Sequence, residues 1–200
     1  MKRGLGLLAL LLLLASPAAA AAERPGQVVE RLNAGLLEIM RSAETLGYEG
    51  RFERFATLLE DTYNLAAMAR AAVGRQWEQL SETQRLRLVD AFSRMTRATY
   101  ASRFKGYSGE RFEVLGREPA LQDLVLVKSR LVKSDGESVA LNYMTQLFDG
   151  RWRIVDVHLD AKYSELARLR AEFGSVLRRE GLDALMAKIE AKIARAANGG

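Results

Sequence analysis

The first half of the chain carries apolar residues three and four positions apart, the spacing of an amphipathic helix. Gly47 and Gly50 interrupt this pattern, and Gly74 follows its third segment in a position typical of a helix end. Asn64 precedes that segment as a predicted N-cap, and Ser81–Gln84 forms a capping box before the longest segment. The predicted helices cover residues 27–43, 51–60, 65–73 and 81–104.

After Gly109 the apolar residues alternate with polar ones, which predicts strands. Asp135-Gly136 and Asp149-Gly150 are strong signals for hairpin turns, so the last three strands are predicted to form an antiparallel meander. The predicted strands are residues 111–115, 124–132, an alternating segment over 139–147, and a segment that begins at Trp152. Two predicted helices, over residues 164–179 and 183–197, follow the strands, with Gly181 between them.

This order of helices, strands and helices indicates the α+β class, with helices wrapped on one face of a curved antiparallel sheet of about four strands. By analogy with cone-like, nuclear-transport-factor-like folds, an apolar cavity is expected between the sheet and the helices. A single domain is expected over residues 23–200. It consists of a helical half (23–109), the sheet (110–158) and the C-terminal helices (159–200).

The stretch from Trp152 to Phe173 joins the last long strand to a helix through a turn. Trp152 and Ile154 alternate on the strand, and apolar residues at helical spacing follow them. A helix folded back on a sheet in this way can enclose an apolar space. A filled core and a lined cavity use the same residue types, so the pattern leaves both open.

Residues 1–22 have the organisation of a secretory signal peptide. Lys2 and Arg3 precede an apolar run, Leu5–Leu14, which is too short to span a membrane. Cleavage is expected near Ala20–Ala22, and because no cysteine follows the run, a lipoprotein anchor is excluded. The mature chain is therefore expected to be exported and soluble.

Composition excludes several classes of site. Removing 22 of the 200 residues takes away two cations and lowers the net charge from +5 to +3, too small an excess to predict a nucleic-acid surface. The chain has no cysteine and one histidine, so disulfides, thiolate metal sites, a zinc site and a Ser-His-Asp triad are not expected. No metal, cofactor or catalytic residue is predicted.

Two segments carry the spacing of known motifs. The first is RAAVGRQWEQLSETQRLRLVDAF at Arg70–Phe92. The second is WRIVDV at Trp152–Val157, followed by Tyr163-Ser164 and an R-x-x-F pattern at Arg170–Phe173. In this order they resemble the periplasmic lipid-binding family of MlaC and the toluene-tolerance proteins. The fuller stretch Tyr163–Phe173 is most similar to the hopanoid-associated HpnM branch, although Ala161 stands where relatives usually carry Gly.

The resemblance implies a periplasmic lipid carrier that binds a phospholipid or a hopanoid in an apolar cavity. It implies a part in an Mla-type transport system, as an auxiliary component of an ABC transporter that maintains outer-membrane lipid asymmetry. The partners would be membrane-anchored lipid-transport complexes of the inner and outer membrane, and the carrier would be a monomer.

The cavity walls would consist of apolar residues from the sheet and from the helices that face it. The predicted lining residues are Trp77, Phe92, Met95, Tyr100, Phe104, Val125, Val127, Leu141, Tyr143, Trp152, Ile154, Leu166, Leu169 and Phe173. The alternative is that these residues form a packed core with no ligand.

Asp156 alternates with the apolar residues of its strand and is expected to face inward, where a carboxylate needs a partner. We expect a structural ion pair with one of Arg70, Arg75 and Arg170. The alternative is an isomerase-like enzyme of a cone-shaped α+β fold, in which Asp156 abstracts a proton from a small apolar molecule.

Overall fold

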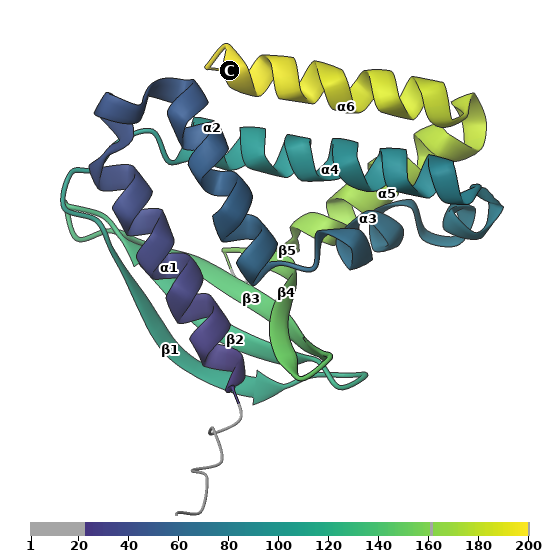
Figure 1. The fold of residues 1–200 in the computed structure, drawn as a ribbon. Helices are drawn as coiled ribbons and strands as arrows, with labels where there is room; N and C mark the ends of the chain where they lie inside the picture. The colour runs from purple at the N-terminus through teal and green to yellow at the C-terminus, as the bar shows by residue number, and fades with distance from the viewer. Residues whose placement is uncertain (1–22, 161, 200) are drawn as a thin grey trace, which may run out of the picture.

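A computed structural model describes residues 23–160 and 162–199, so the predicted signal peptide and Ala161 lie outside the described residues. Its elements follow the predicted order of helices, strands and helices (Figure 1). In chain order they are α1 (Pro25–Arg41), α2 (Ala43–Thr62), α3 (Leu65–Val73), the 3₁₀ helix η1 (Gly74–Gln79), α4 (Glu82–Arg103), β1 (Arg111–Pro119), β2 (Val125–Val132), β3 (Ser138–Phe148), β4 (Arg151–Leu159), β5 (Tyr163–Ser164), α5 (Glu165–Glu180) and α6 (Leu182–Ala197). Among residues 23–160 and 162–199, none of the helices combines the length and the hydropathy of a transmembrane helix.

The helix signals in the sequence correspond to real helix ends. The Asn64 side chain accepts a hydrogen bond from the Ala67 amide (2.9 Å) at the start of α3, and the predicted capping box opens α4. At Gly47 the backbone is left-handed (φ 59°), which kinks α2 as the glycine signal predicted. The predicted break at Gly50 is wrong, because this residue lies inside the second part of α2.

The strands form one antiparallel sheet with the order β1-β2-β3-β4-β5, so the α+β class and the meander are confirmed. The sheet has five strands instead of about four, because Tyr163–Ser164 pairs with the end of β4. Asp149 and Gly150 both adopt positive φ (47° and 77°), as the predicted hairpin turn requires. The Asp149-Gly150 signal therefore correctly placed the two-residue turn between β3 and β4.

A bulge in β4 changes which side of the sheet its residues face. Ile154 pairs with Thr145, whereas Asp156 pairs with the preceding residue of β3, Met144, so Val155 is left without a partner. Neighbouring residues on a strand point to opposite faces, so Asp156 shares a face with Met144 and not with the buried Ile154. The expectation that Asp156 faces inward in period with Ile154 is therefore wrong.

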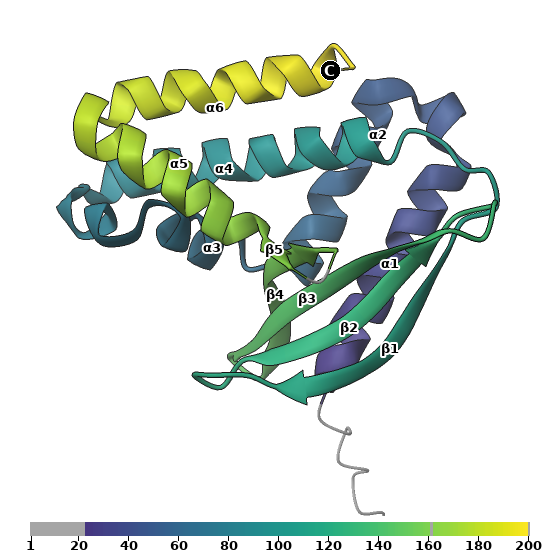
Figure 2. The same ribbon diagram turned by 180° about the vertical axis from the view of Figure 1, so that it is seen from behind.

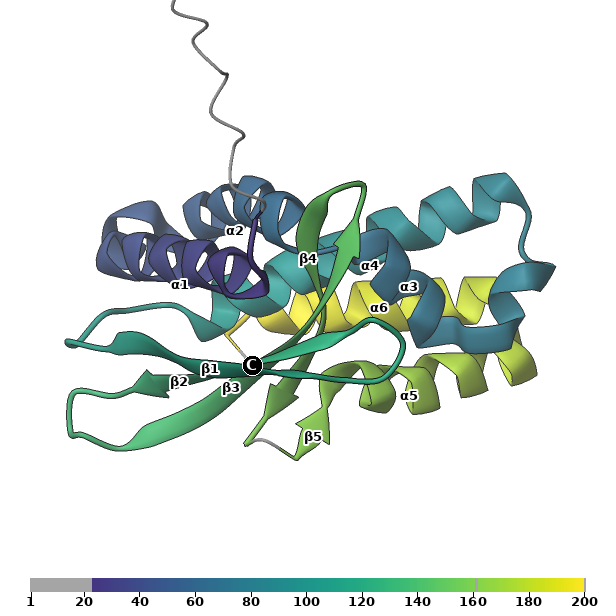
Figure 3. The ribbon, with the colours of Figure 1, turned by 90° about the horizontal axis from the view of Figure 1, so that it is seen from below.

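The helices do not all lie on the sheet. Helix α1 runs along its inner face and contacts the first four strands, while α2, α3 and α5 contact strand β4 (Figures 1 and 2). Helices α3 to α6 pack mainly on one another and form a second layer beside the sheet. In the view from below, no helix lies in front of β1, β2 and β3 (Figure 3). The core therefore runs from the inner sheet face, under α1, into the layer of helices.

Candidate functional site

The predicted cavity residues gather in one apolar interior. Eight of them are buried members of the hydrophobic core: Phe92, Met95, Val127, Leu141, Tyr143, Ile154, Leu169 and Phe173. Trp77, Tyr100, Phe104, Trp152 and Leu166 are partly buried and pack against it, whereas Val125 is half-buried and is not part of this cluster. The structure thus brings most of the predicted set together, from the sheet and from three helices.

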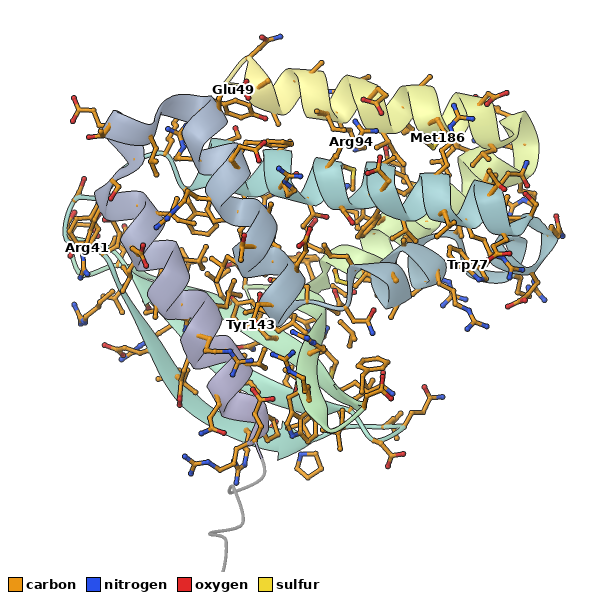
Figure 4. All side chains as sticks on the ribbon, in the orientation of Figure 1. Arg41, Glu49, Trp77, Arg94, Tyr143 and Met186 are labelled. Atoms are coloured by element: carbon orange, nitrogen blue, oxygen red, sulfur yellow. The ribbon has the colours of Figure 1, made fainter. Side chains whose placement is uncertain are left out.

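Two corrections change the shape of this interior. Trp77 lies in η1, at the end of the helix layer away from Tyr143, which lies near the sheet (Figure 4). The Trp77 ring contacts the Arg85 guanidinium, 5.5 Å from the ring centre, and belongs to the packing of that end. Helix α1 forms a further wall of the interior, which its apolar spacing alone does not indicate. Its residues Val28, Val29, Leu32 and Leu36 are fully buried in the core.

Three tyrosines place hydroxyl groups within this apolar region. The hydroxyls of Tyr63, at the end of α2, and Tyr100, on α4, form a hydrogen bond, and their rings meet edge to face at 6.1 Å. Burial raises the pKa of Tyr100 to about 12 and raises the pKa values of Tyr63 and Tyr143 well above 10. All three phenols are therefore neutral at physiological pH and supply hydrogen bonds without charge.

Two further polar atoms in the interior have no hydrogen-bond partner among the described residues. These atoms are Asn33 Oδ1 on α1 and Ser129 Oγ on β2, and both residues are buried. Ser129 follows Val127 by two positions and so lies on the same, inner face of the sheet. An unmet buried polar atom costs about 1–3 kcal/mol, so a ligand with a hydroxyl or carbonyl group would be stabilised here.

A surface groove of about 430 Å³ lies beside the interior. It is lined by Glu60, Tyr63, Asn64, Leu65, Ala66, Ser93, Phe148, Asp149, Arg151 and Arg153. Tyr63 belongs both to this groove and to the core, and the Asn64 amide donates to the Ile154 carbonyl (2.9 Å), which fastens the α2–α3 connection to β4. Its two arginines contact Asp61, and Glu60 and Asp149 also line it, so the charges around the groove are largely balanced.

The Asp156 carboxylate is fully engaged at the corner between β4 and α5. It accepts hydrogen bonds from the Val157 amide (2.7 Å), the Leu166 amide (3.0 Å) and the Ser164 hydroxyl (2.5 Å). His158 Nε2 lies 3.2 Å from the same group. Ser164 in turn caps α5 by accepting from the Ala167 amide. The carboxylate therefore joins the strand to the first turn of the helix.

The predicted ion pair between Asp156 and an arginine does not form. Arg70 pairs with Glu78 at 2.8 Å, and Arg75 and Arg170 line a different groove at the junction of η1 and α5. The bulge at Val155 explains the difference, because it turns the carboxylate to the side where the Leu166 amide at the start of α5 donates to it. Both carboxylate oxygens of Asp156 therefore accept hydrogen bonds from the strand end and from the start of α5.

No group of acidic, histidine or cysteine residues with metal-binding geometry occurs in the described part of the chain.

Comparison with protein families gives a match to the family described as MlaC protein over residues 30–191. A solved structure with a similar fold is a phospholipid-binding protein from Ralstonia solanacearum in complex with a phospholipid. The two chains superpose with a TM-score of 0.77 and 19% sequence identity, over 88% of this chain and 99% of the other. A comparison with curated proteins found no match.

Proposed function

Because the chain belongs to the MlaC family, we propose that it binds a lipid in the interior between the sheet and the helices. The observation that carries the proposal is the apolar interior itself. Its walls come from β2, β3 and β4 on one side and from α1, α4 and α5 on the other. The similar fold of a protein described with a bound phospholipid supports the same assignment.

The energetics of a lipid in water favour an interior site over a surface groove. Each exposed methylene costs about 0.8 kcal/mol, so a chain of about sixteen carbons costs on the order of 13 kcal/mol. The groove beside Tyr63 has charged residues on its walls and does not offer a continuous apolar surface. The core behind it does, with Val127, Ile154 and Phe173 all fully buried.

Fully buried side chains of the sheet and of the helices pack together in this interior, so lipid entry requires the sheet and the helix layer to separate. The connection between α2 and α3 pairs with β4 over a short seam, through the Tyr63–Ile154 bridge and the hydrogen bond from the Asn64 amide to the Ile154 carbonyl. Opening this seam would extend the groove beside Tyr63 into the apolar interior. The neutral tyrosine hydroxyls, Asn33 and Ser129 would then contact hydroxyl or carbonyl groups of the lipid that lie within the interior.

We further propose that the lipid is a phospholipid or a hopanoid and that the protein is a periplasmic shuttle. It would take the lipid from one membrane-anchored complex and deliver it to another in an Mla-type system. The signal-like residues 1–22 and the similarity of Tyr163–Phe173 to the hopanoid-associated branch support these finer assignments. The fused rings of a hopanoid need the same apolar walls as an acyl chain.

The test is Leu141→Trp, which places a bulky ring on the inner face of β3, where Leu141 is 8% exposed. The variant should keep its circular dichroism spectrum and lose most of the co-purified lipid. Leu147→Trp, on the same strand but at a site that is 51% exposed, is the matched control and should keep its lipid.

A second measurement does not depend on the variant folding. A phospholipid with a photoreactive diazirine in its acyl chain should cross-link to inner-face residues such as Val127, Leu141 and Tyr143 of the mature wild-type protein. Cross-links confined to exposed residues such as Leu121 and Leu147, or a folded Leu141→Trp protein with a full complement of lipid, would contradict the proposal.

A further inference from the structure

A second groove, of about 340 Å³, lies at the junction of η1 and α5. Its walls carry three arginines, Arg75, Arg170 and Arg178, and no acidic residue. The remaining lining residues are Val73, Gly74, Gln76, Ala171, Gly174 and Ser175. The side chains of Gln76 and Ser175 can donate hydrogen bonds without adding charge. We name this feature the arginine groove.

Among the described residues, these three arginines have no carboxylate partner, whereas others such as Arg94 and Arg168 do. Among the described residues, no carboxylate oxygen lies within 4 Å of Arg75, Arg170 or Arg178, which are all exposed. The nearest candidates in sequence are used elsewhere. Glu78 pairs with Arg70 (2.8 Å) and Arg85 (3.6 Å). Glu172 contacts Arg168, Lys188 and Lys192.

The backbone around the groove keeps its floor open. Arg170, Gly174 and Arg178 follow one another at intervals of four on α5, so the two arginines flank a glycine on one helix face. A Cβ atom on Gly74 would lie 3.3 Å from Arg170 Nε, and one on Gly174 would lie 3.6 Å from the Val73 carbonyl oxygen. Glycine at position 74 therefore lets this segment approach Arg170 closely, whereas a Cβ at position 174 would make an ordinary contact.

We propose that the arginine groove binds a phosphate group. Guanidinium groups present planar pairs of N–H donors that match the oxygens of a phosphate, and three positive charges near one another are stabilised by an anion between them. The groove beside Tyr63 does not have this property, because Glu60 and Asp149 line it and Asp61 contacts both of its arginines.

Two sources of phosphate share this chemistry: the headgroup of a phospholipid and free inorganic phosphate. The headgroup assignment rests on the proposed lipid-binding function, whereas binding of free phosphate does not. The headgroup is the favoured source because the groove lies on α5 next to Phe173, whose side chain is in the apolar interior.

The experiment uses the mature chain labelled with ¹⁵N and titrated with inorganic phosphate. The amide signals of Gly74 and Gly174 should shift with saturation. Arg75→Gln and Arg178→Gln should each weaken the binding by about tenfold. Arg179→Gln is the matched control, because Arg179 is exposed, lies in the same last turn of α5, lacks a carboxylate partner among the described residues and does not line the groove. It should change the affinity by less than twofold.

Vesicles of phosphatidylcholine, with and without phosphatidylglycerol, then separate the two sources. If Arg75→Gln and Arg178→Gln weaken binding to phosphatidylglycerol vesicles as well as to phosphate, the ligand is a headgroup. If they weaken only the binding of free phosphate, the site binds free phosphate. No phosphate-dependent shift at Gly74 and Gly174, or an equal loss in Arg179→Gln, would overturn the proposal.

Failure of the lipid-carrier proposal has a different signature. In that case the protein would contain no lipid in its interior, and the phosphate titration would still show saturable shifts at Gly74 and Gly174.

Discussion

Removing the Asp156 carboxylate should destabilise the protein strongly, because one side chain joins three elements. Asp156→Ala leaves the Val157 amide, the Leu166 amide and the Ser164 hydroxyl without their acceptor. Asp156 is only 9% exposed, so water replaces these bonds incompletely. Hydrogen bonds to a charged group contribute about 1.5–3 kcal/mol each, and non-additivity reduces the sum. We therefore expect a loss of about 3–5 kcal/mol.

Two further variants, Asp156→Asn and Asp183→Ala, test whether the loss of stability comes from the hydrogen bonds of this carboxylate. Asp156→Asn keeps an acceptor for the Val157 and Leu166 amides, which both bond to Oδ1, and should cost about 1–2 kcal/mol. Asp183→Ala is the control, since its carboxylate is 93% exposed in the first turn of α6, and it should cost less than about 1 kcal/mol.

The assay is urea unfolding at neutral pH followed by circular dichroism. A stability of Asp156→Ala within 1 kcal/mol of wild type would refute the structural role of this carboxylate. A folded Asp156→Asn protein that lost turnover of an apolar substrate would instead support catalysis at this residue.

Two further predictions concern the tyrosine cluster and Gly74. Burial raises the pKa of Tyr100 to about 12. The contribution of Tyr100 to the free energy of unfolding is therefore complete below pH 10, and it declines by about 1.4 kcal/mol per pH unit as the pH rises from 10 towards 12. Tyr100→Phe should lower the free energy of unfolding by about 1 kcal/mol at pH 8. Between pH 8 and pH 11.5 the variant should gain about 2 kcal/mol relative to wild type, because phenylalanine does not ionise. Parallel curves of unfolding free energy against pH for the two proteins would contradict this. Gly74→Ala should cost about 1–3 kcal/mol, because φ is +61° and the new Cβ would lie 3.3 Å from Arg170 Nε. Gly26→Ala, inside α1 with no close contact, should be neutral or slightly stabilising, and an equal loss in both variants would show that the left-handed backbone is not the cause.

The sequence predicted the features that depend on neighbouring residues. Helix α3 has the predicted bounds because its cap at Asn64 and its end at Gly74 are local signals. The meander was predictable for the same reason, since Asp149-Gly150 determines the turn and the turn determines the register. The predicted interior also assembled, because alternation on strands and spacing on helices identify the buried faces.

The features that were missed depend on contacts between distant segments. Alternation alone placed Asp156 with Ile154, and only pairing with β3 introduces the bulge that separates them. No property of the isolated strand indicates that the amide of Leu166 and the hydroxyl of Ser164 satisfy its carboxylate. The packing of α1 on the sheet is likewise not predictable from its sequence, because several helices of the chain have an apolar face that could cover the sheet.

Native mass spectrometry of the protein, expressed with residues 1–22 and purified without detergent, tests the central claim most directly. The account predicts a complex of one chain with one lipid, which organic extraction should identify as a phospholipid or a hopanoid. Leu141→Trp should shift the spectrum to the mass of the bare chain, and Leu147→Trp should not. A wild-type protein that carries no lipid, and takes up none from phospholipid or hopanoid vesicles, would contradict the account.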